Sequence, residues 1–201
     1  MVRKQATFAM AALFWAFLPA AWPATPDQAC MDCHGKDGAS TEFDVPVIGG
    51  LSDQYLTDAM AAYRDKKRAC VETKYRAGDT KRPKTTMCAV AAKLSADDTM
   101  KVVKDLSGEP FVKARQKFDA AKAATGKKIH GTQCEKCHSE GGGSADDDAG
   151  ILAGQWMPYL KQTLADMMGG KRPNPEKMKV KTDPLKPDDV EALLHYYASQ
   201  Q

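Results

Sequence analysis

Apolar residues recur at helical spacing in two matching stretches of the chain. In the first, Ser52 and Asp53 can cap a helix, and the apolar positions that follow have an i, i+3, i+4, i+7 pattern. The second stretch begins near Leu160 and has the same spacing. Each pattern predicts a helix with one face turned to a core. The first face comprises Leu56, Ala59, Met60 and Tyr63, and the second comprises Leu160, Thr163, Leu164 and Met167.

Further helices are predicted near the end of each half. Ser95 followed by Asp98 resembles a capping box, and Pro187 with the two aspartates after it suits a first helical turn. Another helix is expected over residues 118–124, ending near Gly126. These patterns indicate an all-α protein. The buried faces predicted for the two closing helices are Val102, Val103 and Leu106 in one, and Val190, Leu193, Leu194 and Tyr197 in the other.

The two halves of the chain are copies of each other. A shift of 104 residues superposes the first part of each half and a shift of 91 superposes the rest, so the first copy has 13 extra residues (104 minus 91). These extra residues lie between Arg68 and Met87. The helical pattern is interrupted at residues 107–110, which predicts one domain over residues 25–109 and another over residues 110–201. The matching pairs include Gly50 with Gly154, Tyr55 with Tyr159, Arg68 with Arg172, and Met87 with Met178.

One five-residue motif occurs in each half, as Cys30-Met31-Asp32-Cys33-His34 and as Cys134-Glu135-Lys136-Cys137-His138. The C-x-x-C-H pattern is typical of covalent haem c attachment, in which two cysteines add to the haem vinyl groups and the histidine binds iron. A redox dithiol needs only C-x-x-C, and neither half holds the further ligands of a tetrahedral zinc site. The sequence therefore predicts two haem c groups. Their covalent links are Cys30 and Cys33, and Cys134 and Cys137, with His34 and His138 on the irons.

Each iron also needs a sixth ligand or an open position. Met87 and Met178 are the only methionines downstream of the motifs that coincide between the copies. Both fall in polar, proline-containing stretches that we expect to be loops, whereas a core methionine is normally found on a helix face. We therefore predict His–Met coordination of both irons, which suits electron transfer and disfavours catalysis at iron.

The remaining histidines and the histidine tautomers complete this picture. His130 and His195 are expected to be exposed or packed side chains, with two-histidine coordination as the minor alternative. Each iron-binding histidine should donate its other ring N–H to a backbone carbonyl. In the first half we expect this carbonyl to be that of Pro46, and the matching position in the second half is Gly150.

Cys70 and Cys88 flank the extra residues of the first copy and have no counterparts in the second. In an oxidising compartment they are expected to form a disulfide. A loop of this length would gain about 3 kcal/mol of stability in the chain-entropy model. The alternative is that Cys88, next to Met87, binds iron as a thiolate.

Residues 1–24 have the features of a secretory signal peptide, with Arg3 and Lys4 before an apolar run that is too short to span a bilayer. Cleavage after Ala21 and cleavage after Ala24 are both open. Without these two cations the chain has 27 basic side chains (29 minus 2) against 26 acidic ones. The basic residues are scattered and not interleaved with aromatic ones, which argues against nucleic-acid binding.

Because of the signal peptide, we expect a periplasmic protein with no membrane span.

Several segments of the second half carry a family resemblance: residues 118–121 (Phe-Asp-Ala-Ala), residues 125–130 (Thr-Gly-Lys-Lys-Ile-His), the second attachment motif and residues 151–160. They resemble the dihaem cytochrome subunit of flavocytochrome c sulfide dehydrogenase and, more widely, the two-haem carriers called cytochrome c-four. The resemblance implies two tandem class I cytochrome c domains. It also implies a heterodimer with a larger subunit that carries FAD. The insertion with Cys70 and Cys88 departs from the family pattern.

On this interpretation the chain is not an enzyme on its own. It accepts electrons from the FAD-containing sulfide dehydrogenase subunit and passes them to a soluble cytochrome c, as part of a sulfide–cytochrome c reductase. Two alternatives are open. The chain could be a free cytochrome c-four-type carrier that serves a terminal oxidase, or a thiosulfate-oxidising dihaem enzyme that uses Cys88 at iron.

Overall fold

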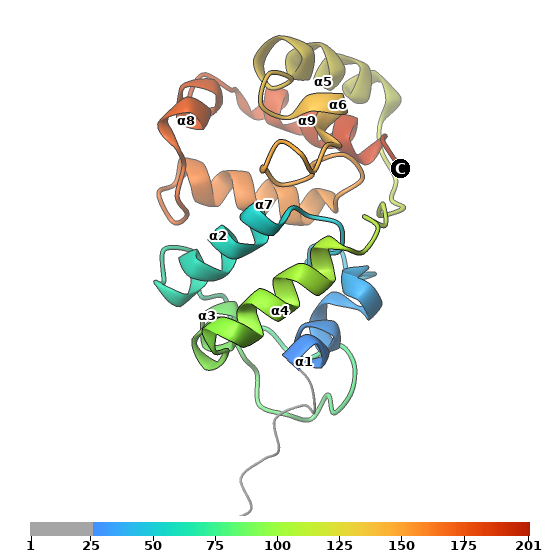
Figure 1. The fold of residues 1–201 in the computed structure, drawn as a ribbon. Coiled ribbons are helices and arrows are strands. Elements are labelled where there is room, and N and C mark those ends of the chain that lie inside the picture. Colours follow the sequence, from blue (N-terminus) through green and yellow to red (C-terminus); the bar gives the residue numbers. More distant parts are fainter. Residues whose placement is uncertain (1–25) are drawn as a thin grey trace, which may run out of the picture.

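The computed structural model describes residues 26–201, so the predicted signal peptide and its two cleavage sites lie outside the described residues. Within this range the structure is helical, and its extended pairing is limited to one isolated bridge between Thr73 and Thr85. The first half holds α1 (Pro26–His34), the short 3-10 helix η1 (Lys36–Gly38), α2 (Asp53–Arg64), α3 (Met87–Lys93) and α4 (Ala96–Ser107). The second half holds α5 (Ala120–Gln133), α6 (Ser139–Gly142), α7 (Met157–Met168), α8 (Glu176–Thr182) and α9 (Pro187–Ala198). Figure 1 shows the two halves one above the other, with α2 and α7 facing each other.

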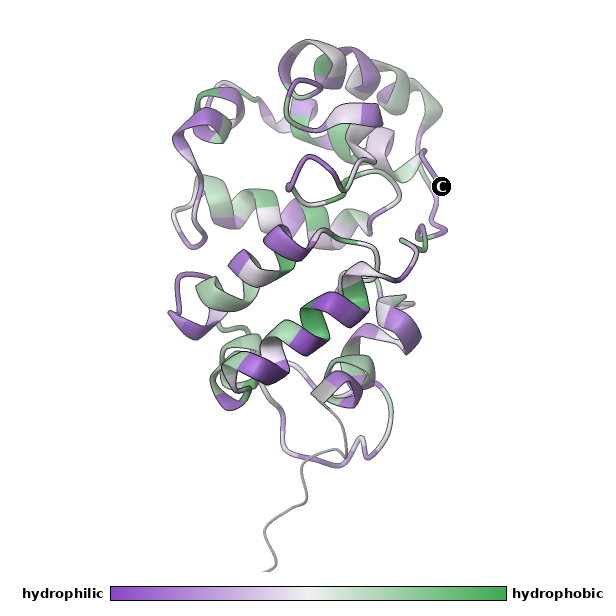
Figure 2. Ribbon diagram, in the orientation of Figure 1, coloured by the Kyte–Doolittle hydropathy of each residue, from purple (hydrophilic) through white to green (hydrophobic). Residues whose placement is uncertain are grey.

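The helix starts follow the capping residues that the sequence predicted. Ser52 accepts a hydrogen bond from the Tyr55 N–H at 3.1 Å, and Ser95 accepts one from the Asp98 N–H at 3.0 Å. Each bond satisfies an amide that has no partner within its own helix. The apolar face of α4 is buried as expected, and Figure 2 shows hydrophobic and hydrophilic bands alternating along this helix. The predicted helices after Ser52, Ser95 and Lys186 are thus confirmed.

The helix expected over residues 118–124 is longer than predicted. It does not end near Gly126 but continues to Gln133. Gly126 serves packing instead, because a Cβ built on it would lie 2.0 Å from the Ala192 carbonyl oxygen of α9. The glycine therefore lets α5 and α9 cross at close range. The prediction of a helix end at Gly126 was wrong, because this glycine is needed for helix packing and not for a turn.

The structure has two hydrophobic cores. The first is formed mainly by α2 and α4, with Ile151 of the second half packed into it, and the second is formed by α7 and α9. The segment between α4 and α5, where the sequence places the domain boundary, crosses to the second half, since the Ala114 N–H donates to the Gly154 carbonyl at 2.7 Å. The first core comprises Leu51, Leu56, Val102, Val103, Leu106 and Ile151, and the second comprises Leu160, Leu193, Leu194, Tyr196 and Tyr197.

The two halves are joined by a buried amide. Gln155, which is 2% exposed, accepts from the Val47 N–H at 3.0 Å and donates to the Val47 carbonyl at 2.9 Å. Beside it, the indole N–H of Trp156 donates to the Ser40 carbonyl at 3.0 Å. One half thus satisfies backbone groups of the other, which ties the halves into one unit. None of the helices over residues 26–201 combines the length and the apolar character that a bilayer crossing requires.

Candidate haem-binding sites

The first attachment motif lies at the C-terminal end of α1. Cys30, Cys33 and His34 are at positions i, i+3 and i+4, which places them on one side of the helix. His34 is buried, and its Nδ1 lies 2.9 Å from the Pro46 carbonyl oxygen. Because a carbonyl only accepts, Nδ1 must carry the proton and Nε2 is left unprotonated. The carbonyl predicted from the sequence is confirmed, and the histidine has the tautomer that a metal ligand needs.

Burial also sets the protonation of the motif. It lowers the pKa of His34, against a smaller upward effect of the Pro46 carbonyl, and so keeps the imidazole neutral. Burial, with the charge of Asp27, raises the pKa of Cys30 to about 11. Burial and Asp32 also raise the pKa of Cys33. The surroundings of Cys30 and Cys33 therefore favour an uncharged sulfur atom. The thioether that each cysteine would form with a haem is uncharged.

The second motif has a different local structure. It forms a turn after α5, in which the Cys137 and His138 N–H groups both donate to the Cys134 carbonyl at 3.0 Å. The helix that carries the first motif thus has no counterpart at the second. The pKa of His138 is lowered mainly by burial, and the Gly150 carbonyl opposes this as the counterpart of Pro46. Cys137 is exposed, whereas Cys33 is half-buried, so the two motifs differ in their access to solvent.

Met87 and Met178 are half-buried, but they do not lie in loops. Met87 is the first residue of α3, whose N-cap Thr86 accepts from the Ala89 N–H at 3.0 Å. Met178 lies within α8, and its N–H donates to the Pro175 carbonyl at 2.8 Å. The expectation of loops was wrong because a threonine cap in one copy and a proline start in the other each begin a short helix. Their role on iron stays a prediction.

Cys70 and Cys88 form a disulfide, and Cys88 is buried while Cys70 is exposed. The bond closes the extra residues of the first copy into a loop directly beside Met87. With its sulfur in this bond, Cys88 has no thiolate to offer to an iron. The alternative of thiolate coordination therefore lacks its ligand in this structure.

The other two histidines have partners within the protein. His130 is 1% exposed, with Nδ1 at 3.0 Å from the Tyr197 hydroxyl and Nε2 at 2.6 Å from a Glu135 carboxylate oxygen. His195 Nδ1 accepts from the Asp119 N–H at 3.0 Å. Because both ring nitrogens of His130 form hydrogen bonds within the protein, it is a packed histidine. This agrees with the expectation of an exposed or packed side chain.

Two tyrosines and two arginines form a cluster between the halves. The sequence shows them as matching pairs but does not predict that they meet: Tyr55, Tyr159, Arg68 and Arg172. Tyr55 of α2 accepts from Arg172 Nη2 at 3.1 Å and from Arg68 Nη2 at 3.4 Å. Burial acts to raise the pKa of Tyr55, but Arg172 and Arg68 together lower it to about 8. Burial and the neighbouring Tyr55 raise the pKa of Tyr159 to about 12. The duplicated residues thus meet one another across the interface.

This cluster fits the haem that the motifs imply. The groups that face Arg172 are two phenols rather than carboxylates. Within residues 26–201, no carboxylate forms an ion pair with Arg172 or Arg68, and each haem would bring two anionic propionates. Arg68, 9% exposed, and Arg172 are therefore the residues that would hold the propionates.

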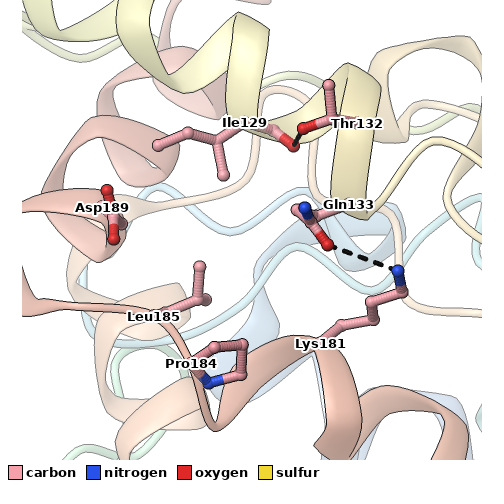
Figure 3. Close-up of a pocket in the computed structure, with 7 residues that line it drawn as sticks. All are labelled: Ile129, Thr132, Gln133, Lys181, Pro184, Leu185 and Asp189. Atoms are coloured by element: carbon pink, nitrogen blue, oxygen red, sulfur yellow. Dashed lines mark hydrogen bonds between the residues drawn. The ribbon is translucent and has the colours of Figure 1, made fainter.

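A pocket of about 240 Å³ lies beside the second motif, between α5, α8 and the start of α9 (Figure 3). Lys181 Nζ donates to Gln133 Oε1 at 3.3 Å across it. Gln133 directly precedes Cys134, whose pKa is raised by burial and lowered to a smaller degree by Tyr197 and Lys181. The apolar part of the lining comes from Ile129, Pro184 and Leu185, and the polar part comes from both flanking helices and Asp189.

Two helical halves, each with a C-x-x-C-H motif whose histidine has a pKa lowered mainly by burial, define a protein of two tandem class I cytochrome c domains. The chain is 28% identical over 184 residues to the thiosulfate dehydrogenase electron acceptor of Thiomonas intermedia, covering 86% of this chain and 78% of that protein. It is 26% identical over 181 residues to cytochrome c4 of Pseudomonas aeruginosa, covering 83% of this chain and 81% of that protein. No protein-family model matches the chain.

The fold agrees with these relatives. The crystal structure of reduced recombinant cytochrome c4 from Pseudomonas stutzeri superposes with a TM-score of 0.69 at 23% identity, covering 86% of this chain and 95% of that chain. The predicted all-α fold with two class I cytochrome c domains is confirmed. The chain is related to dihaem electron-transfer cytochromes, in agreement with the predicted pair of haem c groups.

Proposed function

We propose that this chain is a periplasmic dihaem electron-transfer protein and not an enzyme on its own. Cys30 and Cys33 would hold the first haem, with His34 and Met87 on its iron. The second haem would be held by Cys134 and Cys137, with His138 and Met178 on its iron. When bound, a haem c iron takes up and releases one electron at a time.

The hydrogen bond between His34 Nδ1 and the Pro46 carbonyl carries this proposal. It fixes the ring orientation and directs the unprotonated Nε2 away from the carbonyl, as in other metal-bound histidines. Burial maintains the neutral ring, because a charged imidazole would be desolvated without a counterion. With a thioether as the sixth ligand, both axial positions would be filled, which suits outer-sphere transfer over chemistry at iron.

The partner we propose is a sulfur-oxidising dehydrogenase. The relative from Thiomonas intermedia is named as the electron acceptor of a thiosulfate dehydrogenase, and this supports thiosulfate dehydrogenase as the donor. The family resemblance in the sequence supports a second donor of the same class, an FAD-containing sulfide dehydrogenase subunit in a heterodimer with this chain. In both cases a soluble cytochrome c is the proposed acceptor.

A free carrier is the second candidate function. The likeness to cytochrome c4 over more than four fifths of the chain supports it. Such a carrier would deliver electrons to a terminal oxidase and would form no lasting complex with a dehydrogenase.

The test is reduction of the oxidised, haem-loaded protein, followed by its absorbance. Purified thiosulfate dehydrogenase with thiosulfate is expected to reduce both haems, whereas thiosulfate alone should reduce neither. A parallel reaction uses an FAD-containing sulfide dehydrogenase subunit with sulfide. Reduction by the flavoprotein with sulfide, and not by thiosulfate dehydrogenase with thiosulfate, would assign the sulfide partner. Reduction by neither enzyme would contradict a sulfur-oxidising donor, and turnover of thiosulfate without dehydrogenase would contradict the absence of enzyme activity.

A further inference from the structure

The residues that only the first copy has do not extend into solvent but return to the first attachment motif. The backbone N–H groups of Arg76 and Ala77 both donate to the Asp32 carbonyl at 2.9 Å. Asp32 lies between the two cysteines of that motif. The loop between Cys70 and Cys88 is therefore fixed by its backbone to the peptide that would hold the first haem.

The Asp32 side chain makes the second connection. It is buried, and its carboxylate forms an ion pair with the guanidinium of Arg82 and accepts from Gln28 Nε2 at 2.9 Å. The Arg82 guanidinium also lies 3.6 Å from the centre of the Tyr75 ring, within the same loop. Because a buried carboxylate that loses its cation is strongly destabilising, Arg82 is the side chain that adds most to the backbone attachment of the loop to the motif.

The two ends of this loop are fixed to each other next to Met87. The disulfide joins Cys70 to Cys88, next to Met87. Thr73 and Thr85 exchange two backbone hydrogen bonds, of 2.8 and 2.9 Å, just inside it. A single closed loop thus contacts the attachment motif in its middle and the candidate sixth ligand at its end.

Nothing equivalent is encoded in the second copy. The position that matches Asp32 is Lys136, and only five residues lie between Arg172 and Met178. The difference is visible at the cysteines, because Cys33 is half-buried under the loop while Cys137 is exposed. The two candidate haem sites therefore differ, because only the first has a loop that covers its attachment motif.

We propose that the loop from Cys70 to Cys88 is a clasp for the first haem site, in which Arg82 is the positioning residue that keeps Met87 over the iron. The proposal rests on the proposed function, since it requires Met87 to be the sixth ligand. The clasp connects the attachment motif to the segment that holds Met87, so opening it would loosen Met87 and leave Met178 unaffected.

The test compares Arg82→Gln with Lys84→Gln in the haem-loaded protein. Lys84 pairs with Glu72 at 3.0 Å in the same loop but does not reach the motif, so it is a matched control. Carbon monoxide binds ferrous haem only after the sixth ligand has left. We expect Arg82→Gln to bind it at one of the two haems and roughly tenfold faster or more than the wild type, because the loop would lose its ion pair with the buried Asp32 carboxylate. Lys84→Gln should behave as the wild type.

A second variant, Cys70→Ser with Cys88→Ser, opens the clasp at its other end and should have the same effect, while Arg82→Lys should restore part of the wild-type rate. Equal carbon monoxide binding by Arg82→Gln, the double serine variant and the wild type would overturn the clasp. Failure of the proposed function is recognised separately. In that case the oxidised wild type would lack the methionine–iron charge-transfer band, whereas a failed clasp would leave that band in every variant.

Discussion

At the residue scale, the chemistry follows from short, contiguous patterns. Two cysteines and a histidine within five residues bring their functional groups together whatever the remaining fold is, so the attachment residues could be predicted from the sequence. The Pro46 carbonyl could be predicted because it lies at a fixed place in the loop after the motif, and the structure confirms it. The environments of Met87 and Met178 could not, since helix formation there depends on one threonine and one proline outside the apolar pattern.

Replacing Met178 by alanine tests its role directly. If this thioether is the sixth ligand, its removal leaves an open position on the second iron. The ferrous Met178→Ala protein should then bind carbon monoxide at one haem of two, which a difference spectrum measures. Met168→Ala removes an exposed methionine from the end of α7 and should bind carbon monoxide no faster than the wild type. A Met178→Ala protein that retains both haems and binds no carbon monoxide would exclude this methionine as a ligand.

Asp119 makes stability depend on pH. Its carboxylate caps α5 by accepting from the Lys122 N–H at 2.9 Å, and this hydrogen bond is the main reason that its pKa is lowered. A lowered folded-state pKa means that the stabilisation is present above the ordinary pKa and is lost as the pH falls through the folded-state value. The stability advantage of the wild type over Asp119→Asn should therefore shrink from pH 7 to pH 3. Urea unfolding at the two pH values measures it, and a constant difference would contradict the assignment.

At the scale of elements, the apolar periodicity predicted the positions of α2, α4 and α9, because each has a local cap and one buried face. It failed at α5, where Gly126 was taken as a helix end. A glycine at a helix crossing and a glycine at a helix terminus look alike in sequence, because only the partner helix distinguishes them. That partner, α9, lies some seventy residues further along the chain.

The crossing of α5 and α9 should be intolerant of a single methyl group. Gly126→Ala would place a Cβ against the Ala192 carbonyl, and we expect a loss of about 3 kcal/mol in unfolding free energy from overpacking. Gly131→Ala in the same helix has no heavy atom within 4 Å of its Cβ and should be neutral or stabilising. Thermal or urea unfolding of the two variants checks this. Equal stability of both would show that the close crossing is not required.

At the scale of the whole molecule, the duplication predicted two similar domains but not how they meet. Residues that match in sequence, Tyr55 with Tyr159 and Arg68 with Arg172, come together between α2 and α7. Such contacts depend on the placement of one domain against the other, which neither copy encodes alone. The same holds for Gln155, whose isolated polar character gave no sign that it would be buried against Val47.

Gln155 should hold the two domains together. Gln155→Ala leaves the Val47 N–H and carbonyl without their partners, at a cost of about 3 kcal/mol. We expect urea unfolding to separate into two transitions, because the domains lose their coupling. Gln162→Ala removes an exposed glutamine of α7 that bonds only to Asp166, and it should unfold like the wild type. A single unshifted transition in Gln155→Ala would contradict this role.

The most direct test of the account is the intact mass of the protein after export to a periplasm that attaches haem. The account predicts the mass of the processed chain plus two haems, and loss of one haem mass when Cys134 and Cys137 are replaced by alanine. A wild-type mass with one added haem or none would contradict it.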